Sequence, residues 1–214
     1  MDRVSAFISY SSKEKIIGGQ FKSYLENYCG YETFIAHDDI LGSTIWEDEI
    51  IQAIKDAEIF IPLISKEFKE SPFTDQETGI AVFIKKKIIP IKLDVINPYG
   101  FISKYQALQY KKYPSHYSLH DNIKEIVLTI AQIGFSYKLH HQKIINSLIY
   151  AFCTSKSFDT TNATIKIISS YGHFTPDHLK QIVQAIKNND QVIGAFGLVE
   201  FKKFLHKTYK ITID

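Results

Sequence analysis

The chain has few of the residues on which several common kinds of binding site depend. Arg3 is its only arginine, so phosphate binding would rely on lysines, hydroxyls and backbone N–H groups rather than on a bidentate arginine clamp. The two cysteines, Cys29 and Cys153, lie far apart and form no CxxC or zinc-binding pattern. No apolar run approaches the length of a membrane span. We therefore expect a reduced, cytoplasmic protein with no metal site, no signal peptide and no membrane partner.

The first part of the chain contains an alternation of strand and helix patterns. Nearly continuous apolar runs predict parallel strands covered on both faces, at residues 4–10, 31–37, 58–65 and 87–93. Helix starts lie between them: capping boxes at Ser11-x-x-Glu14 and Thr44-x-x-Glu47, and an N-terminal proline at Pro72. A weaker strand near 107–110 and a helix over 121–133 follow. This order predicts an α/β domain with a flavodoxin-like parallel sheet, residues 1–134.

The character of the sequence changes after Gly134. Helical patterns follow at 137–153, 160–171, 176–187 and about 198–206 without a strand pattern between them. Gly172 marks a helix end and Thr175-Pro176 a helix start. Residues 1–134 hold 15 Lys/Arg against 18 Asp/Glu, whereas residues 135–214 hold 10 against 5. We expect a small, basic, all-α C-terminal domain, residues 135–214, but with a net charge of only +2 no nucleic-acid partner.

The carboxyl ends of the predicted strands, where open parallel sheets bind ligands, carry hydroxyls and acids. These residues are Ser9, Tyr10 and Ser11, then Asp38, then Ser65, then Asp94. A phosphoacceptor receiver domain is not expected, because it needs clustered acids after the first strand and an aspartate after the third. Gly18-Gly19 lacks the ending of a P-loop, and no G-x-G-x-x-G motif follows a predicted strand. A P-loop NTPase and a Rossmann dehydrogenase are therefore not expected either.

A glutamate interrupts the apolar row of the third predicted helix. The core-facing row consists of Phe73, Glu77, Ile80, Ala81 and Ile84. A carboxylate on such a row lies either at the domain surface, reaching solvent or a lysine, or in a cleft. The pattern alone favours the surface position for Glu77, and it makes Phe73 an ordinary core aromatic.

Several motifs, in order, resemble the Toll/interleukin-1 receptor (TIR) domain family. FISYS at 7–11 is similar to the first TIR motif, and DDILG at 38–42 followed by Trp46 resembles the BB-loop and its helix. Residues 60–65 and SPFTDQE at 71–77 resemble the third strand and the S-x-W-C-x-x-E helix, and residues 88–91 the fourth strand. Phe73 and Thr74 replace the usual Trp and Cys. The resemblance covers about residues 4–134.

The resemblance implies an NAD⁺-cleaving enzyme. In catalytic TIR domains the glutamate of that helix is essential, which assigns the role to Glu77. Nicotinamide is a cationic leaving group that departs neutral, so one carboxylate that stabilises the oxocarbenium-like transition state is enough. Further substrate contacts are expected from Ser9, Tyr10, Ser11, Asp38, Gly42, Trp46, Ser65 and Phe73. NAD⁺ is the substrate, and no additional cofactor is expected.

The motifs leave the reaction product and the partners open. Attack by water gives hydrolysis, whereas attack by adenine or a ribose hydroxyl gives a cyclic ADP-ribose isomer. TIR active sites are often completed by neighbouring TIR domains, so self-association is expected, and the helical tail is a candidate contact for an effector or sensor protein. The resemblance suggests a bacterial immune component of the anti-phage type. The alternative is a non-catalytic adaptor that binds other TIR domains, and Glu77 favours the enzyme.

Overall fold

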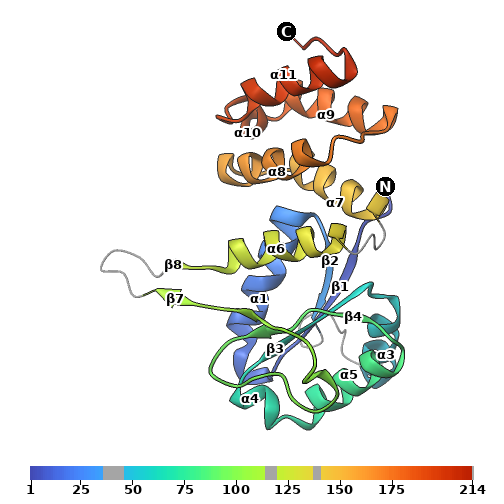
Figure 1. Cartoon of the computed structure of the whole chain (residues 1–214), viewed down its shortest axis with the longest axis vertical. Coiled ribbons are helices and arrows are strands. Elements are labelled where there is room, and N and C mark those ends of the chain that lie inside the picture. The colour runs from blue at the N-terminus through green and yellow to red at the C-terminus, as the bar shows by residue number, and fades with distance from the viewer. Residues whose placement is uncertain (36–45, 114–119, 137–140, 214) are drawn as a thin grey trace. The chain divides into compact units, whose positions relative to one another are not determined.

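A computed structural model describes residues 1–35, 46–113, 120–136 and 141–213 of the chain (Figure 1). The chain divides into two compact units. The first, called here the sheet unit, contains residues 4–25 and 31–132. The second, called the helical unit, contains residues 1–3 and 26–30 and the chain from Ile133 onward. Two short segments from the N-terminal part of the sequence therefore belong with the C-terminal helices.

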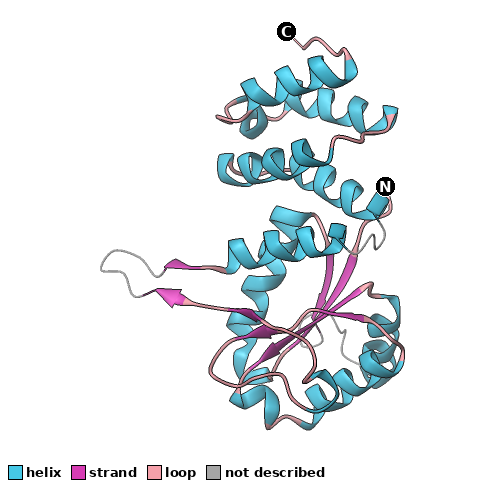
Figure 2. Ribbon diagram, in the orientation of Figure 1, coloured by secondary structure: helices cyan, strands magenta, loops and turns pink. Residues whose placement is uncertain are grey.

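A parallel sheet forms the centre of the sheet unit (Figure 2). Its strands are β1 (Ser5–Ser9), β2 (Glu32–Ile35), β3 (Ile59–Ile64), β4 (Lys87–Ile88), β5 (Ile91–Lys92) and β6 (Leu108–Gln109). The order is β2-β1-β3-β5-β6, with β4 also paired to β3, and every pairing is parallel. The predicted flavodoxin-like sheet is confirmed. The predicted fourth strand is divided at Pro90, because proline has no N–H to donate to the ladder.

Helices lie between these strands and after the last of them. They are α1 (Lys15–Tyr24), α3 (Trp46–Asp56), α4 (Lys66–Lys69), α5 (Pro72–Phe83) and α6 (Ile123–Ser136), with 3₁₀ turns at Ser12–Glu14 and Gly100–Ile102. A short antiparallel hairpin, β7 (Lys112–Tyr113) with β8 (His120–Asp121), was not predicted from the sequence. Only half of the first predicted capping box forms: the Glu14 carboxylate accepts the Ser11 N–H, but the Ser11 hydroxyl makes no capping bond. Thr44 of the second box lies outside the described residues.

A row of phenylalanines crosses the sheet on the face that α3 and α5 cover. Phe7 of β1 is in register with Phe34 of β2 and Phe60 of β3, and its ring stacks on theirs with centroid distances of 5.5 and 5.6 Å. Such aromatic pairs contribute about 0.5–1.5 kcal/mol each beyond the burial of their area. Ile50 of α3 and Ala81 of α5 pack into the same core. This packing places α3 and α5 in contact with each other.

Helix α5 follows the predicted core-facing row in part: Glu77 and Ala81 are buried, and Ile80 and Ile84 pack partly buried against the core. Its buried side chains are Thr74, Glu77, Thr78 and Ala81. Phe73 is 50% exposed, so the prediction of a core aromatic at this position was wrong. Thr74 is buried instead, because its hydroxyl donates to the carbonyl oxygens of Phe68 and Ser71 at 2.6 and 2.8 Å.

The helical unit confirms the predicted all-α C-terminal region. Its helices are α7 (His141–Cys153), α8 (Phe158–Tyr171), α9 (Pro176–Asn188), α10 (Asp190–Ile193) and α11 (Leu198–Tyr209). The predicted stop at Gly172, which has a φ of 65°, and the predicted start at Thr175, which forms a capping box with His178, are both confirmed. Across the described ranges, no helix combines the length and the apolar character that crossing a membrane requires.

The helical unit also holds the single arginine. The Arg3 guanidinium lies over the Tyr150 ring, 3.9 Å from its centroid, and donates to the Gly30 carbonyl oxygen at 3.2 Å. Gly30 itself ends the π-helical turn Leu25–Cys29 with a φ of 67°. A Cβ at this position would lie 1.9 Å from the Ser147 carbonyl oxygen, so only glycine fits. Arg3 therefore has a structural role.

Candidate functional site

Glu77 lies beside the carboxyl end of β1. Its side chain is 7% exposed, and its Oε2 accepts a hydrogen bond of 2.5 Å from the hydroxyl of Ser9, the last residue of β1. Ser9 is buried as well. The surface position that the sequence pattern alone favoured for Glu77 is therefore wrong.

Burial changes the acid–base behaviour of Glu77. The loss of solvation disfavours the charged form and raises the pKa of the carboxyl from 4.5 to about 7, while the hydrogen bond from Ser9 acts in the opposite direction. Both protonation states are then populated at neutral pH. Carboxyl groups with raised pKa values that adjoin a cleft are concentrated at functional sites.

A small cleft between α3 and α5 adjoins the Glu77 side chain. Its volume is about 160 Å³. It is lined by Glu47, Ile50 and Ile51 of α3 and by Phe73, Gln76, Glu77 and Ile80 of α5. Ligand pockets usually measure roughly 300–1,000 Å³. This cleft is therefore large enough for one ring rather than for a whole dinucleotide.

The structure brings some of the predicted site residues together. Glu77 and Phe73 line the cleft, and Ser9 is hydrogen-bonded to Glu77. Tyr10 is not among the described residues that line it: its ring is 3% exposed and packs against Gly18, where a Cβ would lie 2.9 Å away. Asp38, Gly42 and the Trp46 side chain lie outside the described part of the chain.

Ser11 and Ser65 are instead grouped around a second carboxylate, Glu14. The Ser65 hydroxyl bonds to Glu14 and accepts the Phe68 N–H at 3.0 Å, which caps α4. Burial raises the pKa of Glu14, the hydrogen bond from Ser65 opposes this, and the nearby charges of Glu67 and Asp94 add to the increase. Glu14 was predicted only as part of a capping box.

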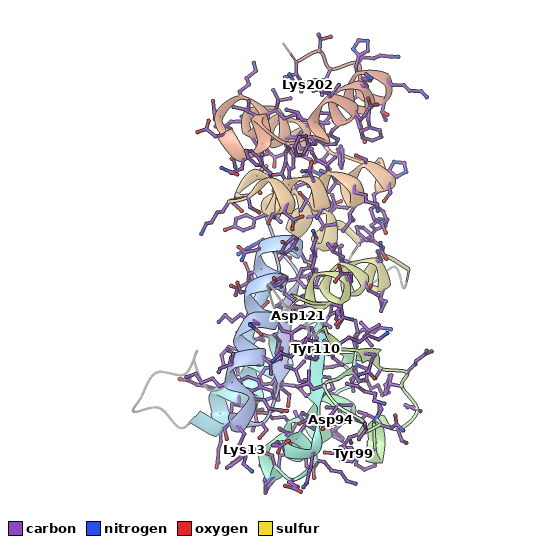
Figure 3. All side chains as sticks on the ribbon, turned by 90° about the vertical axis from the view of Figure 1, so that its left-hand side faces the viewer. Lys13, Asp94, Tyr99, Tyr110, Asp121 and Lys202 are labelled. Atoms are coloured by element: carbon purple, nitrogen blue, oxygen red, sulfur yellow. The ribbon has the colours of Figure 1, made fainter. Side chains whose placement is uncertain are left out.

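Asp94 lies two residues after β5 and hydrogen-bonds to two segments at this edge of the sheet (Figure 3). Its carboxylate accepts the N–H groups of Lys66 and Ile96 at 2.8 and 2.7 Å. Within the described residues, no group of three or more His, Cys, Asp or Glu side chains is arranged to hold a metal ion. The two hydrogen bonds from Lys66 and Ile96 give Asp94 a structural role in joining these segments.

Glu47, Ile51 and Gln76 line the cleft but were not predicted from the sequence, and Ile50 and Ile80 were predicted only as members of apolar helix faces. For Glu47 a signal was present, because Glu47, Ile50, Ile51 and Ile54 follow helical spacing on one face of α3. The carboxylate was interpreted as part of a capping box instead. Gln76 carried no such signal.

Comparison with known proteins identifies the family. Residues 6–127, more than half of the chain, match the family model described as TIR domain, and the chain belongs to this family. No curated protein matches it. Similar solved structures include the TIR domain of the Toll-related receptor TRR-2 from Hydra magnipapillata, with 19% identity over 49% of this chain and 82% of that one and a TM-score of 0.44. Another is the 2-desoxiribosyltransferase from Leishmania mexicana, with 15% identity over 55% of this chain and 78% of that one and a TM-score of 0.35.

Proposed function

We propose that this TIR protein cleaves the bond between nicotinamide and ribose in NAD⁺. One observation carries the proposal: the carboxyl of Glu77 is buried at the carboxyl end of the sheet and forms part of the wall of a ring-sized cleft. The family motif around Glu77 supports the same role. A docking module has no need of a carboxylate in this position, because burying it opposes ionisation.

The chemistry follows from the charges of the reactants. When the glycosidic C–N bond breaks, its electron pair moves to the pyridinium nitrogen, nicotinamide leaves neutral, and positive charge develops on the ribose. The ionised Glu77 carboxylate stabilises this charge more strongly in a buried site than in water. Ser9 fixes the direction of the carboxylate through its hydrogen bond. The apolar side chains of the cleft, Phe73 among them, hold the nicotinamide ring.

The rest of the substrate would bind outside the cleft. A volume of about 160 Å³ leaves no room for the ribose, the phosphates and the adenine together. Within this proposal those contacts come from the segment that contains Asp38 and Gly42 and from a neighbouring copy of the chain, so activity depends on self-association. The oxygen of water, or an adenine nitrogen or ribose hydroxyl of the same ADP-ribose, then forms a bond to the ribose carbon that nicotinamide has left, and the nucleophile loses a proton to solvent. Such an enzyme would serve in bacterial immunity, by producing a signal or by depleting NAD⁺.

A second function, adaptor binding to other TIR domains, has one observation in its favour. Phe83 and Phe101 are 84% and 75% exposed, and exposed aromatic side chains are common at protein-binding surfaces. The two functions are separated by incubating the full chain at high concentration with NAD⁺ and measuring nicotinamide, ADP-ribose and cyclic products by chromatography. Nicotinamide release supports the enzyme. Self-association in sedimentation experiments without any release would support the adaptor.

A further inference from the structure

Two carboxylates, those of Glu47 and Glu77, are among the described residues that line the cleft between α3 and α5. Glu77 is buried in α5, whereas Glu47 is exposed in the first turn of α3. The other described lining residues are uncharged, and none of them is a lysine or an arginine. The cleft thus combines apolar walls with acidic groups from two helices.

Size, wall chemistry and charge together define the ligand that this cleft favours. A volume of about 160 Å³ accommodates a single substituted ring. The cleft is lined by the apolar side chains of Ile50, Ile51, Phe73 and Ile80. They favour binding of a planar ring, because its apolar surface is transferred out of water. Carboxylates repel an anion and attract a cation, whereas a neutral ring of the same shape gains only the apolar contacts. The best fit is a cationic aromatic ring.

We propose that Glu47 makes this cleft selective for a cationic aromatic ring over the neutral ring of the same shape. The inference rests on the proposed function, because the nicotinamide ring is cationic in NAD⁺ and neutral after cleavage. Glu47 therefore strengthens the binding of the substrate and not that of the released product. Glu47 is a specificity residue, and Glu77 remains the group that acts on the ribose.

The two carboxylates act at different stages. In the bound substrate the positive charge is on the ring, where Glu47 attracts it. In the transition state the charge has moved towards the ribose carbon, where Glu77 stabilises it. An interaction that is stronger in the ground state than in the transition state lowers KM without raising kcat. Glu47→Gln is therefore expected to raise KM and to leave kcat unchanged or slightly higher.

The direct test compares two ligands of the same shape and different charge. Dissociation constants of the ring-N-methylated nicotinamide cation and of neutral nicotinamide are measured by NMR titration of the full chain. We expect the native chain to prefer the cation. Glu47→Gln is expected to weaken binding of the cation roughly three- to tenfold and to change binding of nicotinamide by less than about twofold, since an exposed carboxylate is partly screened. The ratio of the two constants is insensitive to a general loss of folding.

Glu49→Gln is the matched control. It makes the same change on the same helix, but Glu49 lines a different cavity, which it shares with Ser5 and Thr33. This variant is expected to keep the native ratio of dissociation constants. Equal binding of both ligands by the native chain, or an unchanged ratio in Glu47→Gln, would overturn the proposal.

Kinetics separate this inference from the proposed function. A chain that prefers the cation through Glu47 but releases no nicotinamide from NAD⁺ would contradict the proposed function and uphold charge selection. A chain that releases nicotinamide with the same KM in the native and Glu47→Gln forms would uphold the enzyme and contradict charge selection. A KM raised several-fold in Glu47→Gln alone, with the Glu49→Gln value unchanged, supports both.

Discussion

At the scale of single residues, burial keeps the Glu77 carboxyl close to half ionised at neutral pH. Its pKa is raised to about 7, and the carboxylate form is the one that stabilises a sugar cation. Since kcat/KM reports the ionisation of the free enzyme, we expect it to rise with pH through a midpoint near pH 7. Initial rates of nicotinamide release at low NAD⁺, from about pH 5 to about pH 9, measure this profile. A rate that is flat or falls across that range would contradict the role of the ionised carboxylate.

Ser9 adjusts the same ionisation. Its hydroxyl donates to Glu77 and lowers the carboxyl pKa relative to burial alone. Ser9→Ala is therefore expected to shift the midpoint of the kcat/KM profile upward by about one pH unit. Ser11→Ala is the control, because Ser11 is also a buried serine but its neighbouring carboxylate is Glu14, and among the described residues the only side-chain hydrogen bond that lowers the pKa of Glu77 is that of Ser9. A midpoint that moves downward in Ser9→Ala would exclude this assignment.

At the scale of secondary-structure elements, the first turn of α5 sets the position of Glu77. Thr74 joins this turn to the preceding residues through its bonds to the carbonyl oxygens of Phe68 and Ser71. Thr74→Val keeps the shape of the side chain and removes both bonds. We expect it to lower the free energy of unfolding by about 1 kcal/mol, measured by urea titration.

An exposed threonine provides the comparison for Thr74. The Thr154 hydroxyl also bonds to a backbone carbonyl, that of Tyr150 at 2.8 Å, but in an exposed position. Thr154→Val is therefore expected to change the stability by less than about 0.5 kcal/mol. Equal effects of the two substitutions would show that burial of the Thr74 bonds has no special importance for α5.

The order of the elements could be predicted from sequence, because apolar runs and helix caps are local signals. For this reason Gly172 correctly marked the end of one helix and Pro176 the start of the next. The burial of Thr74 in place of Phe73 at the start of α5 could not be predicted, because Phe73 is the more apolar of the two side chains. Thr74 is stable there only because two carbonyl groups accept its hydroxyl, and no sequence pattern reveals them.

The site was predictable to a similar extent. Glu77 stood out because it interrupts an apolar row within a family motif. Its bond to Ser9 was not predictable, because the two residues lie 68 positions apart in the sequence. Glu47 was missed because α3 and α5 form a common cleft only through their packing on the phenylalanines of the sheet. The hairpin of β7 and β8 was missed because strands of two residues are too short to show an alternation of apolar and polar side chains.

At the scale of the whole molecule, the helical unit depends on residues from both ends of the sequence. Asn146 donates to the Asp2 carbonyl oxygen at 2.7 Å, and Arg3 binds Tyr150 and Gly30. A fragment of residues 1–134 would lose Asn146 and Tyr150 and expose the groups they cover. We expect this fragment to unfold at a lower urea concentration than the full chain. The same midpoint for both would contradict a stabilising role for the contacts that Asp2, Arg3 and Gly30 make with the C-terminal helices.

Glu77→Gln separates loss of function from loss of structure. Glu77 has a higher pKa in the folded chain, about 7, than its ordinary 4.5, so its protonation stabilises the fold at low pH. That contribution is complete below about pH 4.5 and is lost as the pH rises through about 7. Glutamine is never charged, and we expect Glu77→Gln to be more stable than the native chain at about pH 8, by up to about 3 kcal/mol. Urea unfolding at that pH measures the difference.

The most direct measurement is nicotinamide release from NAD⁺ by the native and Glu77→Gln chains at equal high concentration and about pH 8, with folding verified as above. We expect release by the native chain. For the folded variant we expect a rate at least about a hundredfold lower, which is the loss typical of removing one group that stabilises charge in the transition state. Equal release by both chains would show that the buried carboxylate does not act on the ribose cation.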